Sequence, residues 1–186
     1  MKKQIVTIIV LVALAALVAV GFYFLANASV SGAEGQTEVT EVEELIAMDL
    51  SVSYPQSPRA VVNLYCRMLT AFYNEEYDEE QMQGLLDQMY FLYDEDLQAI
   101  NPIDTYYITM EAELLSHGSD GWHISNYAIP DTDEVTYQTV AGREMALLTV
   151  SFYIKEGNSF VKSYQDFVLR KDANKNWKIY GYSLHN

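Results

Sequence analysis

The segment Met145–Arg170, MALLTVSFYIKEGNSFVKSYQDFVLR, gives the clearest prediction of secondary structure in the sequence. Its apolar side chains alternate with other residues on both sides of a turn. Every second residue from Ala146 to Ile154 is apolar, which is the period of a half-buried strand. Glu156-Gly157-Asn158 has the composition of a tight turn, and residues 160–170 form a second strand-like run. Strands joined by a short turn pair in antiparallel fashion. The stretch therefore predicts a long antiparallel hairpin.

Shorter segments on either side of this hairpin complete the predicted sheet. Trp122–Ile129 and Glu134–Val140 are candidate strands before it, and they are separated by Pro130 and acidic turn residues. Trp177–Leu184 is a closing strand after the polar loop 171–176. Because all these connections are short, we expect an antiparallel sheet of four to five strands.

Helical patterns precede the sheet. Ser57 is a helix N-cap residue, Pro58 suits the first helical position, and apolar residues then recur at helical spacing. Asp78 and Gln81 form a candidate capping box for a second helix. The three expected helices cover residues 57–74, 78–100 and 101–118. Helices followed by an antiparallel sheet predict an α+β fold, with three helices packed on one face of a curved sheet.

An uncharged run at residues 5–25 predicts a transmembrane helix. Its 21 residues are long enough to span a hydrocarbon layer of about 30 Å. Lys2 and Lys3 precede the run, and the charges after it begin with the acid Glu34. The positive-inside rule then places the N-terminus in the cytoplasm and the rest of the chain outside the cell membrane. We expect a single-pass protein with residues 1–28 as cytoplasmic tip and anchor.

A cleaved signal peptide is the alternative for this segment. Ala26-Asn27-Ala28 has the small-x-small pattern of a cleavage site after Ala28. However, the apolar run is longer than the usual signal-peptide core of about 7–15 residues, and Phe22-Tyr23-Phe24 crowds the approach to the site. We favour an uncleaved anchor, and both interpretations export the rest of the chain.

Residues 29–53 are interpreted as an acidic, flexible stalk between the anchor and a domain at 54–186. Residues 29–40 contain glycine, serine and threonine with almost no apolar side chains, which is typical of a tether. The part from Val42 to Leu50 is more apolar, and we expect it to dock on the domain as a short helix or strand.

The charge balance excludes one class of partner. After residue 28, the chain has 26 acidic and nine basic residues, a net charge of −17. This surface repels phosphate backbones, so nucleic acid is not an expected partner. The remaining expectations are a protein or a small apolar ligand outside the membrane, with the bilayer contacted through residues 5–25.

Metal and cofactor motifs are absent from the sequence. The three histidines, His117, His123 and His185, fall in a turn, a strand and the tail, without the close pairing of a zinc site. The loop Asp172–Asn176 opens like a calcium loop, but Trp177 stands where that loop needs glycine. A turn between strands explains it better, and we expect neither a metal nor a cofactor.

The element order from Ser57 to the C-terminus resembles the nuclear transport factor 2-like superfamily, whose members curve a sheet around helices to form a cone. More narrowly, the segments 54–62, 169–172 and 177–181 are similar to a family of uncharacterised membrane-anchored proteins from Gram-positive bacteria. The superfamily resemblance implies a conical cavity and, because its members often pair through the outer sheet face, a homodimer. The narrower resemblance implies no activity.

In such a cone, the first helix and the inner faces of the strands would line the cavity. The resemblance makes candidates of Tyr65, Tyr106, Tyr107, His123, Tyr127, Tyr153 and Asp166. The alternatives are structural. Tyr65 and Tyr107 lie on apolar stripes and suit core filling, whereas Asp166 shares its strand parity with the basic residues Lys162 and Arg170, which favours the outer face.

We expect a non-enzymatic extracytoplasmic domain that binds a partner or a small ligand. No nucleophile elbow or phosphate-binding glycine loop supports an enzyme. The alternative is an isomerase, dehydratase or hydrolase that uses the cavity of the same fold. A third hypothesis is an accessory module with a filled cone and an exposed aromatic patch. A cavity smaller than roughly 300 Å³ would argue against a typical ligand site.

Overall fold

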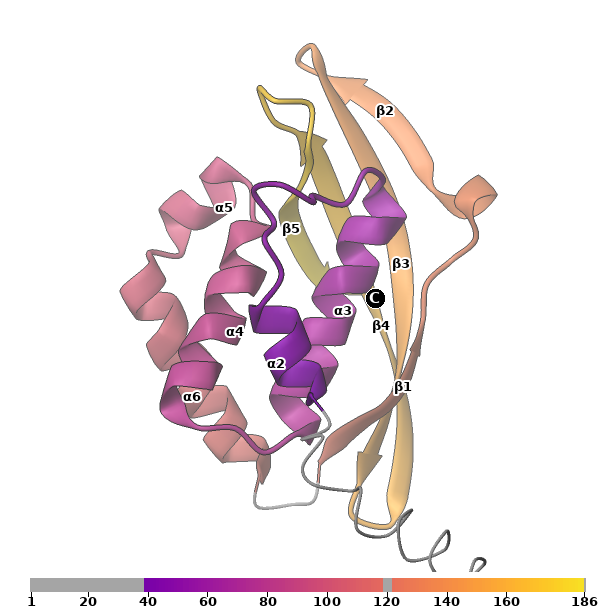
Figure 1. The fold of residues 1–186 in the computed structure, drawn as a ribbon. Coiled ribbons are helices and arrows are strands. Elements are labelled where there is room, and N and C mark those ends of the chain that lie inside the picture. The colour runs from indigo at the N-terminus through magenta and orange to yellow at the C-terminus, as the bar shows by residue number, and fades with distance from the viewer. Residues whose placement is uncertain (1–38, 119–121, 186) are drawn as a thin grey trace, which may run out of the picture. The chain divides into compact units, whose positions relative to one another are not determined.

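A five-stranded antiparallel sheet forms one layer of the fold, and the helices lie on one side of it (Figure 1). The computed structural model describes residues 39–118 and 122–185. The expected anchor at 5–25 and the start of the stalk lie outside the described residues. Within them, no helix combines the length and the apolar content needed to cross a membrane.

The sheet is built around the predicted hairpin. Its strands are β1 (His123–Ala128), β2 (Thr136–Val140), β3 (Arg143–Glu156), β4 (Ser159–Lys171) and β5 (Trp177–Leu184), with the short 3-10 helix η1 (Thr132–Glu134) between β1 and β2. The strand order is β1-β3-β4-β5, and β2 also pairs with β3. β1 and β2 therefore occupy successive parts of the same edge of β3. The pairings between these five strands are all antiparallel, which confirms the predicted sheet, whereas an isolated bridge between Tyr93 and Ile179 is parallel.

The inner face of the sheet follows from the period of two. Alternate β3 residues Ala146, Leu148, Val150 and Phe152 are all buried. Directly opposite partners in an antiparallel pair share a face, and Phe167 of β4, the partner of Leu148, is likewise buried. The alternating residues of the sequence are therefore the ones that face the core, and the residues between them lie on the outer face of the sheet.

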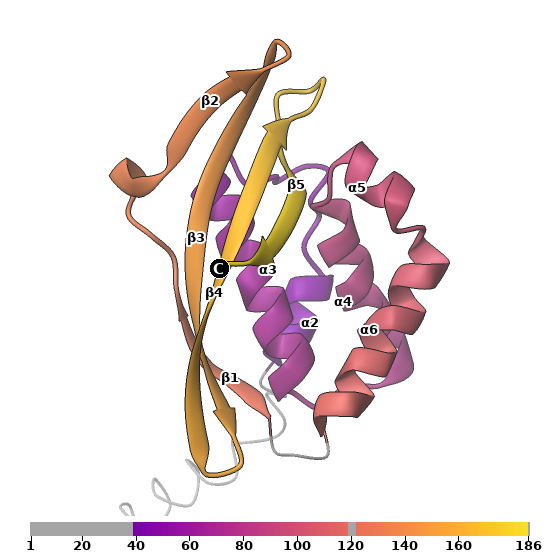
Figure 2. The same ribbon diagram turned by 180° about the vertical axis from the view of Figure 1, so that it is seen from behind.

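Within the described residues, five helices lie on this side of the sheet: α2 (Glu41–Ile46), α3 (Pro58–Asn74), α4 (Glu79–Phe91), α5 (Glu95–Ile100) and α6 (Ile103–Gly118). α3 lies next to the sheet, and α4 and α6 lie beyond it (Figures 1 and 2). The predicted caps are present, because the Ser57 hydroxyl accepts a hydrogen bond from the Ala60 amide, and Asp78 and Gln81 form the capping box of α4. The α+β class is confirmed.

The single helix expected at residues 78–100 is instead two helices, α4 and α5. Between them, the Leu92 carbonyl accepts a hydrogen bond from the Ile179 amide, and the Asp94 amide donates to the Ile179 carbonyl, each at 2.8 Å. The Asp94 carboxylate then caps α5 by accepting from the Asp96 amide at 3.0 Å. The apolar stripe continues through this break, so periodicity gives no sign of it.

α2 is the short docking segment expected between Val42 and Leu50. Val42 and Leu45 are fully buried against the rest of the fold. α2 also approaches α4 closely, since a Cβ atom at Gly84 would lie 3.2 Å from Ile46 Cγ2. The compact unit that contains the sheet therefore starts at Thr40, within the range interpreted as stalk.

A buried ion pair joins β4 to the start of α5. The Arg170 Nε donates to Asp94 Oδ2 at 2.9 Å, and its Nη2 makes a second hydrogen bond to the same carboxylate. The Arg170 side chain also contacts Asp96 Oδ2 at 2.7 Å and lies over the Tyr180 ring. Within the described residues, Asp94, Glu95 and Asp96 form the one carboxylate cluster with metal-ligand spacing, and Arg170 already contacts all three.

Candidate functional site

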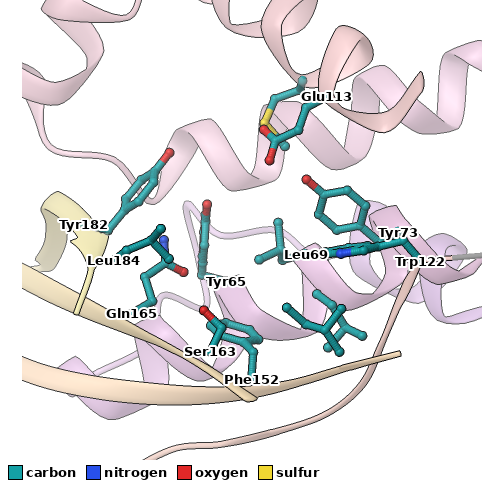
Figure 3. Close-up of a pocket in the computed structure, with 13 residues that line it drawn as sticks. Tyr65, Leu69, Tyr73, Glu113, Trp122, Phe152, Ser163, Gln165, Tyr182 and Leu184 are labelled. Atoms are coloured by element: carbon teal, nitrogen blue, oxygen red, sulfur yellow. The ribbon is translucent and has the colours of Figure 1, made fainter. Parts of the chain in front are cut away.

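A cavity of about 200 Å³ lies between α3, α6 and the inner face of the sheet (Figure 3). Six of its lining residues carry polar groups: Tyr65, Tyr73, Glu113, Ser163, Gln165 and Tyr182. The other seven have apolar or mainly apolar side chains: Leu69, Met110, Trp122, Ile124, Phe152, Ile154 and Leu184. The cavity is therefore mixed in character, with aromatic rings prominent among its walls.

The helical repeat explains which side chains of α3 and α6 line the cavity. Tyr65, Leu69 and Tyr73 recur at every fourth position of α3, so their side chains lie above one another on a single face. From α6, Met110 and Glu113 are three residues apart and also share a face. Figure 3 shows the hydroxyls of Tyr65 and Tyr73 and the Glu113 carboxylate pointing toward the same space.

The strands supply the remaining walls. Phe152 of β3 and Ser163 of β4 are directly paired, so both face inward from adjacent strands. Gln165 follows on the same face of β4, and its partner in β5 is Leu184. Tyr182 lies on the same face of β5, opposite Phe167.

A chain of tyrosine hydroxyls borders the cavity. The Tyr65 hydroxyl lies 3.4 Å from that of Tyr93, which lies 3.2 Å from that of Tyr182. Burial raises the pKa of Tyr65 and of Tyr93 well above the usual value for a phenol. Both phenols are therefore neutral at physiological pH and remain available as hydrogen-bond donors.

Glu113 is the single charged residue among those that line the cavity. It comes from an exposed position on α6, so its carboxylate lies between the cavity and solvent. Burial, followed by the negative charge of Glu113 and a hydrogen bond with it, raises the pKa of Tyr73. The Tyr73 ring packs edge-on against Trp122, with centroids 4.6 Å apart. The cavity thus combines neutral phenols with one negative charge.

Of the candidate residues from the sequence, Tyr65 lines the cavity. Tyr106 lies nearby in the core, where its ring packs against those of Tyr90 and Tyr93. It is 6% exposed, and its hydroxyl makes no hydrogen bond of ordinary geometry, although an interaction with the Tyr93 hydroxyl opposes the effect of burial, which raises its pKa. Tyr107, its neighbour on α6, instead donates a hydrogen bond to the Asp87 carboxylate on α4.

The candidates on the strands lie away from the cavity. Tyr127 faces inward, but its hydroxyl donates to Asn63 of α3 at 3.2 Å and does not line the space. His123 pairs with Lys155 and alternates with the inward Ile124, so it lies on the opposite face. Tyr153 is also on the outer face, where its ring lies 5.1 Å from the Lys162 ammonium.

Asp166 lies on the outer face of the sheet. The sequence favoured this alternative because Asp166 shares the alternation of Lys162 and Arg170 along the strand. Its carboxylate accepts a hydrogen bond from the Thr149 hydroxyl at 2.6 Å and contacts His185 Nδ1 at 2.8 Å. These hydrogen bonds, with that of Thr149 the stronger influence, lower the pKa of Asp166. The group is a surface carboxylate with local partners and takes no part in the cavity.

The sequence interpretation missed Tyr73, Glu113 and Tyr182. A signal for Tyr73 exists, because it continues the every-fourth spacing of Tyr65 and Leu69. Glu113 follows the apolar Met110 by three positions, but a charged residue at such a position is ordinarily assigned to the solvent face. Tyr182 has no local signal, since a bulge in the pairing of β5 with β4 interrupts the alternation before it.

Comparison with protein families places almost the entire chain in one group. The model of a family described as a domain of unknown function (DUF6715) matches residues 1–182. No curated protein matches the sequence. The chain therefore belongs to the DUF6715 family.

Proposed function

We propose that this protein is a membrane-anchored, extracytoplasmic binding domain that holds a small ligand in the cavity between α3 and the sheet. The observation that carries the proposal is the cavity itself, in which apolar walls surround a few convergent polar groups. This combination is typical of small-molecule sites. The uncharged, mostly apolar run at residues 5–25 and the two lysines before it support the proposed location.

We also propose, from the order and packing of its elements, that the fold belongs to the nuclear transport factor 2-like superfamily. Helices precede a sheet with long central strands, and α3 lies against its inner face. The cavity lies between that helix and the strands, where a cone would have its interior. This assignment explains why one end of the core remains open to a ligand.

The cavity volume limits the ligand. About 200 Å³ is below the roughly 300 Å³ under which a typical ligand site is not expected, so the volume argues against a drug-sized ligand and confines the proposal to smaller molecules. An apolar cavity of about 150 Å³ holds benzene, and the space here therefore suits a molecule of about eight non-hydrogen atoms. The proposed ligand is small.

The alternative is an isomerase, dehydratase or hydrolase working in the same cavity. Such chemistry needs a positioned acid or base, and Glu113 is the available carboxylate in the lining. Glu113 belongs to an exposed position on α6, so the cavity does not seclude this carboxylate from water. Binding without turnover is therefore the better supported function.

Native mass spectrometry of the exported domain, residues 39–186, tests the proposal. We expect a reproducible added mass, lost in a Ser163→Phe variant that fills the cavity and kept in a Ser151→Phe variant on the outer face. Ser151 and Ser163 lie on opposite faces of the β3–β4 pair, so they form a matched pair. A bare protein in every spectrum would argue for a partner-protein surface, and a dimer mass would support pairing between copies.

A further inference from the structure

We propose that the ligand of the cavity is a small organic cation of the alkylammonium class. This inference rests on the proposed function, because it specifies the chemistry of a ligand that the cavity is proposed to hold. Three properties of the lining carry it: its aromatic rings, its single negative charge and its size.

Aromatic rings make up much of the cavity wall. Tyr73 and Trp122 form one contacting pair, with centroids 4.6 Å apart. Tyr65 and Tyr182 form a second, at 5.9 Å, and Phe152 adds a ring from β3. The faces of such rings carry negative electrostatic potential and attract cations, most strongly when water is excluded. Ammonium groups with alkyl substituents are recognised in this way.

The charges of the lining favour the same class of ligand. Glu113 contributes a carboxylate, and none of the thirteen lining residues is basic. Because burial raises the pKa values of Tyr65 and Tyr73, their hydroxyls stay neutral at neutral pH and leave Glu113 as the charge of the lining. The chain as a whole has a net charge of −15, which raises the local concentration of cations. An anionic ligand would meet repulsion without a counter-charge.

The lining also distinguishes an alkylammonium from a metal ion. Calcium and magnesium require about six or more oxygen ligands, including carboxylates. The cavity offers one carboxylate, whereas Leu69, Ile124 and Ile154 provide aliphatic surface. Methyl groups on nitrogen can contact that surface while the positive charge faces the rings. A volume of about 200 Å³ accommodates such a head group.

A pair of isosteric probes tests the inference. Choline and its neutral carbon analogue, 3,3-dimethyl-1-butanol, have almost the same shape and differ in charge. We expect isothermal titration calorimetry of residues 39–186 to show choline binding at least about tenfold more tightly, in line with a cation–π and carboxylate contribution. Equal binding of both probes would overturn the cation inference and leave the cavity proposal standing. Binding of neither would overturn both.

Single substitutions test whether the probes bind in this cavity. Glu113→Gln is expected to weaken choline binding about threefold to tenfold, since an exposed carboxylate contributes modestly, and to leave the neutral analogue unchanged. Glu111→Gln, an exposed residue of α6 outside the lining, is the matched control and should change neither. Trp122→Leu should lower the preference for choline over the analogue. An undiminished preference in both Glu113→Gln and Trp122→Leu would contradict a cation site in this cavity.

Discussion

At the scale of single residues, the Tyr106 hydroxyl is an exception to the rule that buried polar groups are paired. Within the described residues, it is the buried side-chain polar atom that lacks a hydrogen bond of ordinary geometry, and the Tyr93 hydroxyl interacts with it only loosely. An unpaired buried hydroxyl costs about 1–3 kcal/mol of desolvation. We therefore expect Tyr106→Phe to raise the free energy of unfolding by about 1 kcal/mol, measured by urea denaturation.

Tyr90→Phe is the matched control for this prediction. The Tyr90 hydroxyl lies 3.2 Å from the Gln98 carbonyl and 3.1 Å from the Asn101 carbonyl, to which it can donate. Its removal should lower the free energy of unfolding by about 1 kcal/mol. If both variants lost stability equally, the Tyr106 hydroxyl would have a partner in solution.

The ion pair of Asp94 with Arg170 leads to a second prediction at this scale. Asp94 is 1% exposed and Arg170 is 8% exposed, so removal of the carboxylate leaves a buried, poorly compensated guanidinium. Asp94→Ala should lower the free energy of unfolding by about 3–5 kcal/mol in chemical denaturation. Asp96→Ala, whose side chain is 60% exposed, should cost about 1 kcal/mol or less. Similar losses in the two variants would show that burial is not the cause.

At the scale of elements, α2 is predicted to be an integral part of the fold. Leu45 is fully buried, whereas Val52 is 79% exposed although both are apolar residues before α3. Leu45→Ala should lower the free energy of unfolding by about 2–5 kcal/mol because it leaves a cavity. Val52→Ala should change it by less than about 0.5 kcal/mol. A small loss for Leu45→Ala would mean that α2 detaches in solution; thermal melts can compare the two variants.

The elements also show which features the sequence can predict. The long hairpin was predicted because alternation over β3 directly reflects burial on one face of a sheet. The division between α4 and α5 was not, because its cause is a hydrogen-bonded contact with Ile179, far away in the sequence. Asp94 was a local sign of a new helix start, but the unbroken apolar stripe concealed it.

The candidate site was less predictable for a related reason. Tyr65 was found because the first helix was placed correctly, and Tyr153 was misplaced because its parity puts it on the outer face with Lys162. The cavity is formed by three parts of the chain, and only tertiary packing brings Glu113 of α6 toward Tyr73 of α3. No pattern within one element contains that information.

At the scale of the whole molecule, the tyrosines predict how stability depends on pH. Burial raises the pKa of Tyr65, Tyr73 and Tyr93 above the ordinary value of 10.0, and that of Tyr77 to about 12. The unfolded chain therefore releases phenolic protons that the folded chain retains. The buried tyrosines therefore make their full contribution to the free energy of unfolding below about pH 10. This contribution declines as the pH rises further.

Denaturation between about pH 8 and about pH 11, with tyrosinate absorbance followed in parallel, measures this effect. We expect the free energy of unfolding to fall over the upper half of this range, and part of the fifteen tyrosines to ionise only on unfolding. A Tyr65→Phe variant should show a shallower decline. Ionisation of all tyrosines near pH 10 in a protein that remains folded would contradict the prediction.

The contact of Leu92 and Asp94 with Ile179 has a consequence for the order of assembly. A ribosome completes α4 and α5 more than seventy residues before it reaches β5, the strand that they contact. The junction between α4 and α5 therefore stays unpaired until Ile179 of β5 has been synthesised, and closing so long a loop slows folding. Because β5 follows the other described strands in the sequence, the junction between α4 and α5 closes only after the rest of that sheet has been synthesised.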